Sequence, residues 1–240
     1  MDDEAKQLAN LSAQLADPAR AAIVLSLMDG SSQPTGELQI SADLSPSSAS
    51  AHLSKLVNSH VLTVTKQGRT KYYRIATAAV AHAVEALSII ASPGAAIQMA
   101  ARSRLNPFAF ARTCYDHLAG KLGVEIAFAM KHRQFIQPAG KNFEVTPSGS
   151  AWLSDLGLDS KELQSGRRIF ATQCLDFTER RYHLAGALGA ALLQRMVELD
   201  WIVKSRVPRA VRLTAQGKIE LGRRLHLEFT QDHNVKLKTD

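Results

Sequence analysis

Six residues with the side chains of a metal or thiol site occur in the second half of the chain. They are Cys114, Asp116, His117, Cys174, Asp176 and His183. Thiolate, imidazole and carboxylate groups are the ligands of zinc in proteins, and a thiolate can also respond to oxidants. The spacing matches no standard zinc motif, because two residues separate Cys114 from His117 and eight separate Cys174 from His183. Three interpretations stay open: buried side chains that only pack, the wall of an organic-effector pocket, or a metal- or redox-sensing site.

Catalysis by the same residues is a further possibility that the sequence does not favour. Cys114 and His117 could act as a nucleophile and its base. A third group that would orient the histidine is not evident, and the sequence has no nucleophile elbow, P-loop or metal-hydrolase motif. We therefore expect that the protein is not an enzyme, and the sequence leaves any cofactor unknown.

An internal repeat carries these six residues. The segment HLAGKLGVEIAFAM begins at His117, and the similar segment HLAGALGAALLQRM begins at His183, 66 residues later. Residues 143–146 and 211–214 also correspond, at a slightly larger offset. Apolar spacing predicts that each copy starts with a helix at its histidine, followed by a hairpin (roughly 134–146 and 201–214) and another helix. Two copies packed about a pseudo-twofold axis would bring like residues near that axis; a chance similarity is the alternative.

The sequence of the first half of the chain predicts two helices, a tight turn and a hairpin. Ser45 is suited to cap a helix and Pro46 to occupy its first turn. The second helix then covers residues 47–60, with apolar side chains on one face. Alternating β-branched residues predict strands at 61–65 and 71–75. This order of elements is typical of a winged helix-turn-helix that reads duplex DNA.

Charge supports the same interpretation. No acidic residue lies between Asp43 and Glu85, whereas five basic residues do. We expect base or phosphate contacts from the helix and phosphate or minor-groove contacts from the hairpin. The predicted DNA-contacting residues are Ser47, Ser48, Ser50, His52 and Lys55 on the helix, and Lys66, Arg69 and Lys71 on the hairpin. The alternative is a serine-rich helix that only faces solvent.

The segments SPSSASAHLSKL, GRTKYYRI and LADPARAAIVLSLMDG resemble the ArsR/SmtB winged-helix repressors over about residues 5–90. The resemblance implies a homodimeric bacterial repressor that releases DNA when it senses an effector. Many relatives sense metals, but their metal motifs are incomplete here: His82 and Glu85 match only half of one motif, and residues 37–41 contain no cysteine. The resemblance therefore does not identify the effector, and we expect His82 and Glu85 to form a pair on a helix surface.

Length and composition agree with a two-domain regulator. The chain has 240 residues, a net charge of +7 and a pI near 9.6, which suits a polyanionic partner. We expect a DNA-binding and dimerisation domain at 1–95, with helices 4–16 and 77–91 in the dimer interface, and an effector-sensing or oligomerisation domain at 106–240. Two cysteines and the absence of a signal-like or membrane-spanning segment favour a cytoplasmic protein.

The predicted fold class is mainly α with small β-hairpins (α+β). The predicted partners are a double-stranded DNA operator, a second copy of the chain and a small-molecule or metal effector, with no membrane. The predicted function is a sequence-specific transcriptional regulator, a dimeric repressor released through its C-terminal domain. The alternatives are a metal- or thiol-redox-sensing repressor and a DNA-binding architectural protein that senses nothing.

Overall fold

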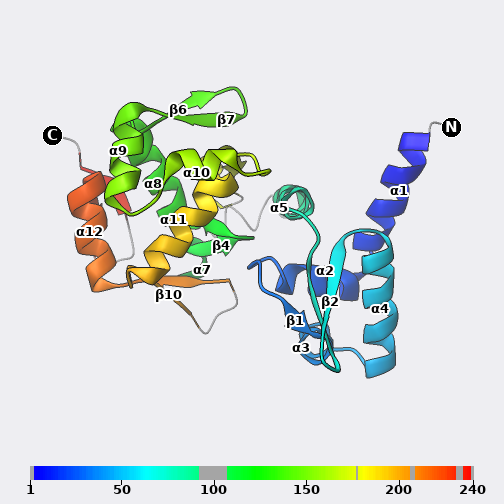
Figure 1. Cartoon of the computed structure of the whole chain (residues 1–240). Helices are drawn as coiled ribbons and strands as arrows, with labels where there is room; N and C mark the ends of the chain where they lie inside the picture. Colours follow the sequence, from blue (N-terminus) through cyan, green and yellow to red (C-terminus); the bar gives the residue numbers. More distant parts are fainter. Residues whose placement is uncertain (1–2, 92–106, 177, 206–208, 231–234, 239–240) are drawn as a thin grey trace. The chain divides into compact units, whose positions relative to one another are not determined.

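The computed structural model describes residues 3–91, 107–176, 178–205, 209–230 and 235–238 (Figure 1). The chain divides into two compact units, Met1–Val84 and Glu85–Asp240. The stretch between the two predicted domains, residues 96–105, lies outside the described residues. The two units are described separately below.

The first unit is a three-stranded sheet with helices against it. Its elements are α1 (Asp3–Leu15), α2 (Pro18–Ser26), β1 (Gln33–Pro34), α3 (Thr35–Ser41), α4 (Pro46–Asn58), β2 (Leu62–Gln67) and β3 (Thr70–Ile75), and α5 (Ala78–Ala91) begins in it. The strands are antiparallel in the order β1-β3-β2. The predicted helix-turn-helix and hairpin are therefore present, and β1 is a strand that the sequence analysis missed.

Short capping motifs define the helices of this unit. Asp17 accepts a hydrogen bond from the backbone N–H of Arg20, and Ser45 accepts one from Ser48, with a proline at the next position in both helices. The Arg20 guanidinium also donates to the carbonyls of Ala13 and Gln14, which caps the C-terminal end of α1. The core consists of fully buried aliphatic side chains from α2 and its C-cap residue, α3, α4, β2 and β3: Ile23, Val24, Leu27, Leu38, Leu53, Leu56, Leu62 and Ile75.

The second unit contains two copies of one arrangement. Its helices are α7 (Pro107–Phe110), α8 (Gly120–His132), α9 (Pro147–Asp155), α10 (Ser160–Ser165), α11 (Gly186–Glu198) and α12 (Ala215–Leu225). Its strands are β4 (Arg112–Cys114), β5 (His117–Ala119), β6 (Ile136–Ala139), β7 (Asn142–Val145), β8 (Thr172–Leu175), β9 (Tyr182–Ala185), β10 (Ile202–Lys204), β11 (Val211–Leu213), β12 (Leu227–Phe229) and β13 (Val235–Leu237). Strands β6-β7-β8-β9 form one antiparallel sheet that contains strands of both copies.

The two copies agree in detail. Thr146 caps α9 by accepting a hydrogen bond from the N–H of Gly149, and Thr214 caps α12 in the same way with Gly217. At each of these glycines an added Cβ would lie within 2.3 Å of a carbonyl oxygen, at the start of the preceding hairpin. Equivalent contacts at equivalent positions indicate that the repeat is structural and not a chance similarity.

The predicted start of each repeat helix is wrong. His117–Ala119 and Tyr182–Ala185 are strands, and the helices begin after them, at Gly120 and Gly186. Both glycines have positive φ, +76° and +83°, and pack closely on backbone carbonyls. This left-handed conformation separates strand from helix, so each copy starts with a small β-hairpin that the sequence analysis did not expect.

The copies pack reciprocally. Helix α8 of the first copy lies against β9 of the second, and α11 of the second lies against β5 of the first. A Cβ added at Gly123 would be 3.7 Å from Cβ of His183, and one added at Gly189 would be 3.2 Å from Cβ of His117. This exchange of equivalent contacts is the pseudo-twofold arrangement that the repeat predicted. Across the described residues, no helix has the length and apolar character needed to cross a bilayer.

Candidate functional site

The first candidate site is the polar face of α4 together with the β2–β3 hairpin. Ser47, Ser50 and Lys55 are exposed on α4, and Ser48 is partly exposed beside the cap residue Ser45. Lys66, Arg69 and Lys71 are exposed on the hairpin. None of these predicted DNA-contacting residues is covered within the first unit, so both elements can approach a partner.

The hairpin concentrates positive charge. Lys66 and Lys71 are directly paired across β2 and β3, and Arg69 lies in the turn after Gly68, whose φ is +61°. Like charges directly opposite each other destabilise a hairpin. An anion bound between them would relieve this repulsion, which fits a phosphate backbone.

His52 is placed differently from the other predicted residues. Its Nδ1 lies 3.7 Å from a carboxylate oxygen of Asp17, and its side chain is only 20% exposed. The ring therefore packs against the N-terminal cap of α2. We expect His52 to orient α4 more than to contact DNA.

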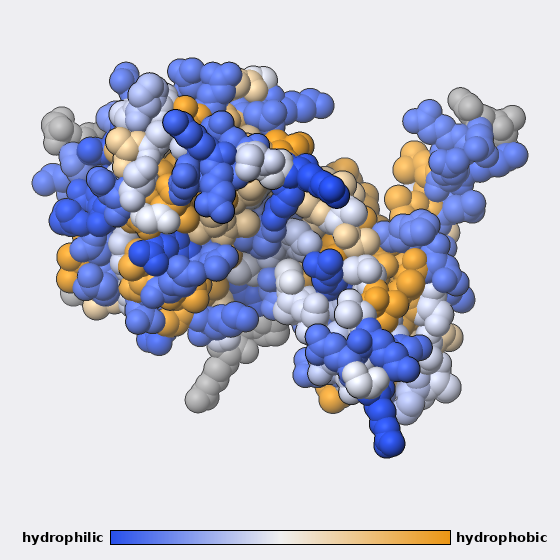
Figure 2. All heavy atoms as spheres, viewed as in Figure 1, coloured by the Kyte–Doolittle hydropathy of each residue, from blue (hydrophilic) through white to orange (hydrophobic). Residues whose placement is uncertain are grey.

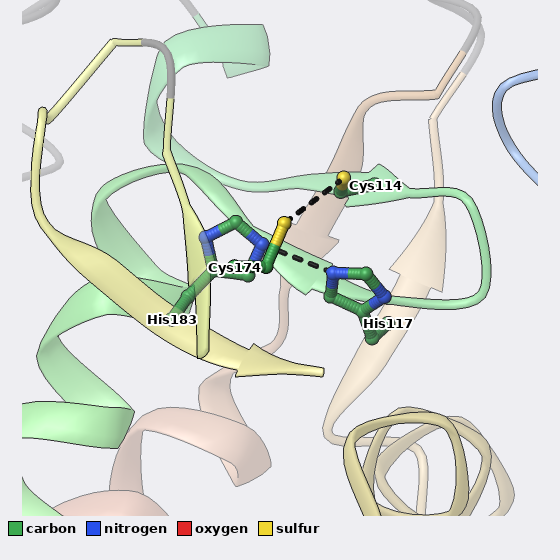
Figure 3. A group of neighbouring side chains, drawn as sticks. All are labelled: Cys114, His117, Cys174 and His183. Carbon is green, nitrogen blue, oxygen red and sulfur yellow. Dashed lines mark hydrogen bonds between the residues drawn. The ribbon is translucent and has the colours of Figure 1, made fainter. Parts of the chain in front are cut away.

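The second candidate site lies where the two copies of the second unit meet. Cys114 at the end of β4, His117 at the start of β5, Cys174 on β8 and His183 on β9 point toward one another (Figure 3). Their ligand atoms all lie within 4.8 Å of one another, and all four residues are buried. The sulfurs are 4.0 Å apart and the Nε2 atoms of the two histidines are 3.1 Å apart. The structure thus brings four of the six predicted effector candidates into one cluster.

The other two candidates, both aspartates, lie behind the histidines. Asp116 Oδ1 is 3.4 Å from Nδ1 of His117, and Asp176 Oδ2 is 3.6 Å from Nδ1 of His183. Asp116 also forms an ion pair with Arg168 at 2.7 Å. Each carboxylate therefore faces the ring nitrogen that points away from the cluster.

Asp176 has a structural role that the sequence analysis missed. Arg112, which is fully buried, donates to both of its carboxylate oxygens at 2.9 and 2.8 Å. The backbone N–H of Gly120 donates to Asp176 at 2.7 Å, so this one carboxylate links both copies of the repeat. Burial alone would raise the pKa of Asp176, but the positive charges of Arg112 and His183 hold it well below its usual range.

Protonation in the cluster follows from the same contacts. The hydrogen bond to Cys174 and burial raise the pKa of the Cys114 thiol well above its usual value. Burial opposes charge on His117, but its contacts with Asp116 and Cys114 raise its pKa to about 9. Without a bound cation, the Cys114 thiol therefore keeps its proton near neutral pH.

One expectation about α5 is wrong. Glu85 does not lie on a helix surface, because it is only 3% exposed and its carboxylate is 3.2 Å from Arg209 and 3.8 Å from Arg112. A buried carboxylate requires such cationic partners. Glu85 is therefore a packing residue of the second unit.

The second unit contains an apolar cavity, and its size bears on the interpretation that the unit binds an organic effector. It lies between α8 and α11, is lined by residues that include Leu118, Ile126 and Leu192, and has a volume of about 30 Å³. That is room for about one water molecule, whereas ligand pockets have volumes of about 300–1,000 Å³. This cavity does not fit an organic effector.

The surface of α1 is a further feature of the first unit. None of its residues is buried, and Leu8 and Leu11 are 64% and 41% exposed. Figure 2 shows hydrophobic surface along this helix among hydrophilic residues. An apolar face of this kind is suited to pack against another helix.

Comparison with known proteins gives one match over most of the chain and others over its first part. The chain is 42% identical over 222 residues to the uncharacterized HTH-type transcriptional regulator YdfF of Bacillus subtilis (strain 168), covering 92% of this chain and 98% of that protein. No protein-family model matches.

Three solved structures match the first part of the chain. NolR from Sinorhizobium fredii is 32% identical over 37% of this chain and 87% of its own, with a TM-score of 0.35. The transcriptional repressor BigR from Xylella fastidiosa is 28% identical over 38% of this chain and 96% of its own, with a TM-score of 0.34. A homodimeric winged helix-turn-helix domain of Mb0332 from Mycobacterium bovis is 24% identical over 39% of this chain and 89% of its own, with a TM-score of 0.36.

Proposed function

Because the chain belongs to the family of HTH-type transcriptional regulators, with a winged helix-turn-helix of the ArsR/SmtB type in its first unit, we propose that it is a dimeric repressor. It binds a pseudo-palindromic operator through α4 and the β2–β3 hairpin, and an effector acts through the second unit. It acts in the cytoplasm by binding and not by catalysis.

The observation that carries DNA binding is the set of exposed basic and hydroxyl-bearing side chains on α4 and the hairpin. No acidic side chain lies between Asp43 and Glu85 to oppose a phosphate backbone. The exposed Ser47 and Ser50 are short donors and acceptors that allow close approach to base edges in the major groove. Cations on the hairpin then meet phosphates or enter the minor groove.

Dimerisation is supported by the exposed apolar face of α1. Packing within the first unit contributes little stability to α1, because none of its residues is buried there. A helix of this kind is stabilised when another surface covers its apolar face. A twofold dimer would place two α4 helices about one turn of the duplex apart. The expected operator is therefore an inverted repeat.

The test is to sequence the DNA that the full-length protein selects from a random library. The expected result is an inverted repeat whose half-sites are centred about 10 base pairs apart. Ser50→Ala should change the preferred base at a position in each half-site, while Lys161→Ala, at an exposed lysine of α10, should leave the motif unchanged. Selection of no motif, or of one half-site only, would contradict a dimeric operator-binding protein.

A further inference from the structure

We propose that Cys114, His117, Cys174 and His183 bind one Zn²⁺ ion in a tetrahedral site at the junction of the two repeats. This site goes beyond the proposed DNA-binding function and does not depend on it. The inference begins with distances. In a tetrahedral zinc site, bond lengths of about 2.3 Å to sulfur and 2.0–2.1 Å to nitrogen place two sulfurs about 3.8 Å apart and two nitrogens about 3.3 Å apart. Here the sulfurs are 4.0 Å apart and the nitrogens 3.1 Å apart.

The orientation of the histidines supports the same conclusion. Both present Nε2 to the cluster, and both direct Nδ1 toward an aspartate, Asp116 or Asp176. A metal-binding histidine typically donates its second ring N–H to a carboxylate, which fixes the tautomer and turns the lone pair of the other nitrogen to the metal. Asp116 is within hydrogen-bonding distance of His117 Nδ1, at 3.4 Å, and Asp176 lies slightly farther from His183 Nδ1, at 3.6 Å, so a carboxylate faces the outer ring nitrogen in each repeat.

Burial and ligand type indicate the class of metal. The four residues are between 0% and 6% exposed, and together they would complete a four-coordinate site with no position open to substrate or water. Two thiolates with two imidazoles suit zinc, whereas magnesium and calcium prefer oxygen ligands. Binding would release both thiol protons and the extra proton of the His117 ring, whose pKa is about 9, so that a dication replaces three protons in the core of the unit.

A disulfide between Cys114 and Cys174 is the competing outcome. Its formation would need an oxidant to accept two electrons, and the sulfurs would have to approach from 4.0 Å to the length of a covalent bond. The experiment below distinguishes the two outcomes.

The test is elemental analysis of the full-length protein, purified with a reductant and dialysed against metal-free buffer. About one zinc ion per chain is expected. Replacement with cobalt(II) should give the intense visible bands of a tetrahedral ion and sulfur-to-cobalt charge transfer in the near ultraviolet. Mass spectrometry after thiol alkylation should show both cysteines reduced once zinc is removed.

Variants separate metal binding from packing. His117→Ala should lower zinc affinity by at least about a hundredfold, whereas His117→Cys should retain zinc as a three-cysteine site. His132→Ala, at an exposed histidine of α8, is the matched control and should bind zinc like the unchanged protein. Circular dichroism checks that each variant is folded.

Three results would overturn the proposal. The first is zinc below about 0.1 per chain after reconstitution of the reduced protein. The second is a Cys114–Cys174 disulfide in the protein isolated with reductant. The third is unchanged zinc affinity when both cysteines are replaced by serine. None of these measurements uses DNA, so the zinc site can fail while operator binding stands.

Discussion

Replacing Lys66, Arg69 and Lys71 of the hairpin by alanine should weaken DNA binding and reduce its dependence on salt. The three side chains are exposed, and the proposed dimer would place six of them on one operator. If each neutralises one phosphate, the slope of log affinity against log salt concentration should fall by about 0.9 per contact, or about 5 in total. When the salt concentration rises from about 50 to 200 mM, the affinity of the variant should therefore fall about a thousandfold less than that of the unchanged protein.

The measurement is fluorescence anisotropy with a labelled operator at several salt concentrations. The matched control replaces three exposed lysines of the second unit, Lys161, Lys218 and Lys236, and so changes the net charge equally. A slope that falls only in the hairpin variant supports direct phosphate contacts. Equal slopes for the hairpin variant and the unchanged protein would refute a role for the hairpin, and equal reductions in both variants would assign the effect to net charge.

Three further substitutions test other parts of the molecule. Leu8→Asp with Leu11→Asp should give monomers in equilibrium sedimentation, since these side chains are exposed on α1; an unchanged dimer would place the interface elsewhere. Asp176→Asn should cost about 3–5 kcal/mol in chemical denaturation at pH 7, because it leaves the buried Arg112 guanidinium with only Glu85, 3.8 Å away, as a carboxylate partner. The lowered pKa of Asp176 stabilises the unchanged protein above about pH 4, so stability should fall as the pH drops further, and this fall should be smaller in Asp176→Asn. Gly149→Ala should lower the melting temperature, because its Cβ would lie 2.0 Å from a carbonyl oxygen, whereas Gly36→Ala, with nothing within 4 Å, should not.

The DNA-binding unit was largely predictable because its signals are local. A hydroxyl or carboxylate cap followed by proline defines the start of both α2 and α4, and alternation over six residues defines each hairpin strand. Strand β1 has only two residues and one of them is Pro34, so no periodic pattern could reveal it. Its pairing with β3 depends on tertiary packing.

The Cys/His cluster was predictable only through the repeat. The connection between β4 and β5 is two residues, whereas the one between β8 and β9 is six, so the two Cys–His spacings differ and match no motif. The three- and four-residue strands that carry the ligands were too short to recognise, and the residues from His117 and from His183 onward were assigned to helices. The buried pair of Arg112 and Asp176 joins positions 64 residues apart, a contact without a sequence signal.

The position of the cluster on the pseudo-twofold axis means that each repeat supplies half of it, one cysteine and one histidine. A separate single repeat could complete the set only by associating with a second copy, and would lose translational and rotational freedom each time it did so. When both repeats belong to one polypeptide, their association is intramolecular. The connecting chain then sets the effective concentration of one repeat near the other. The completeness of the cluster is therefore independent of how much protein the cell contains, whereas the proposed DNA binding as a dimer would depend on it.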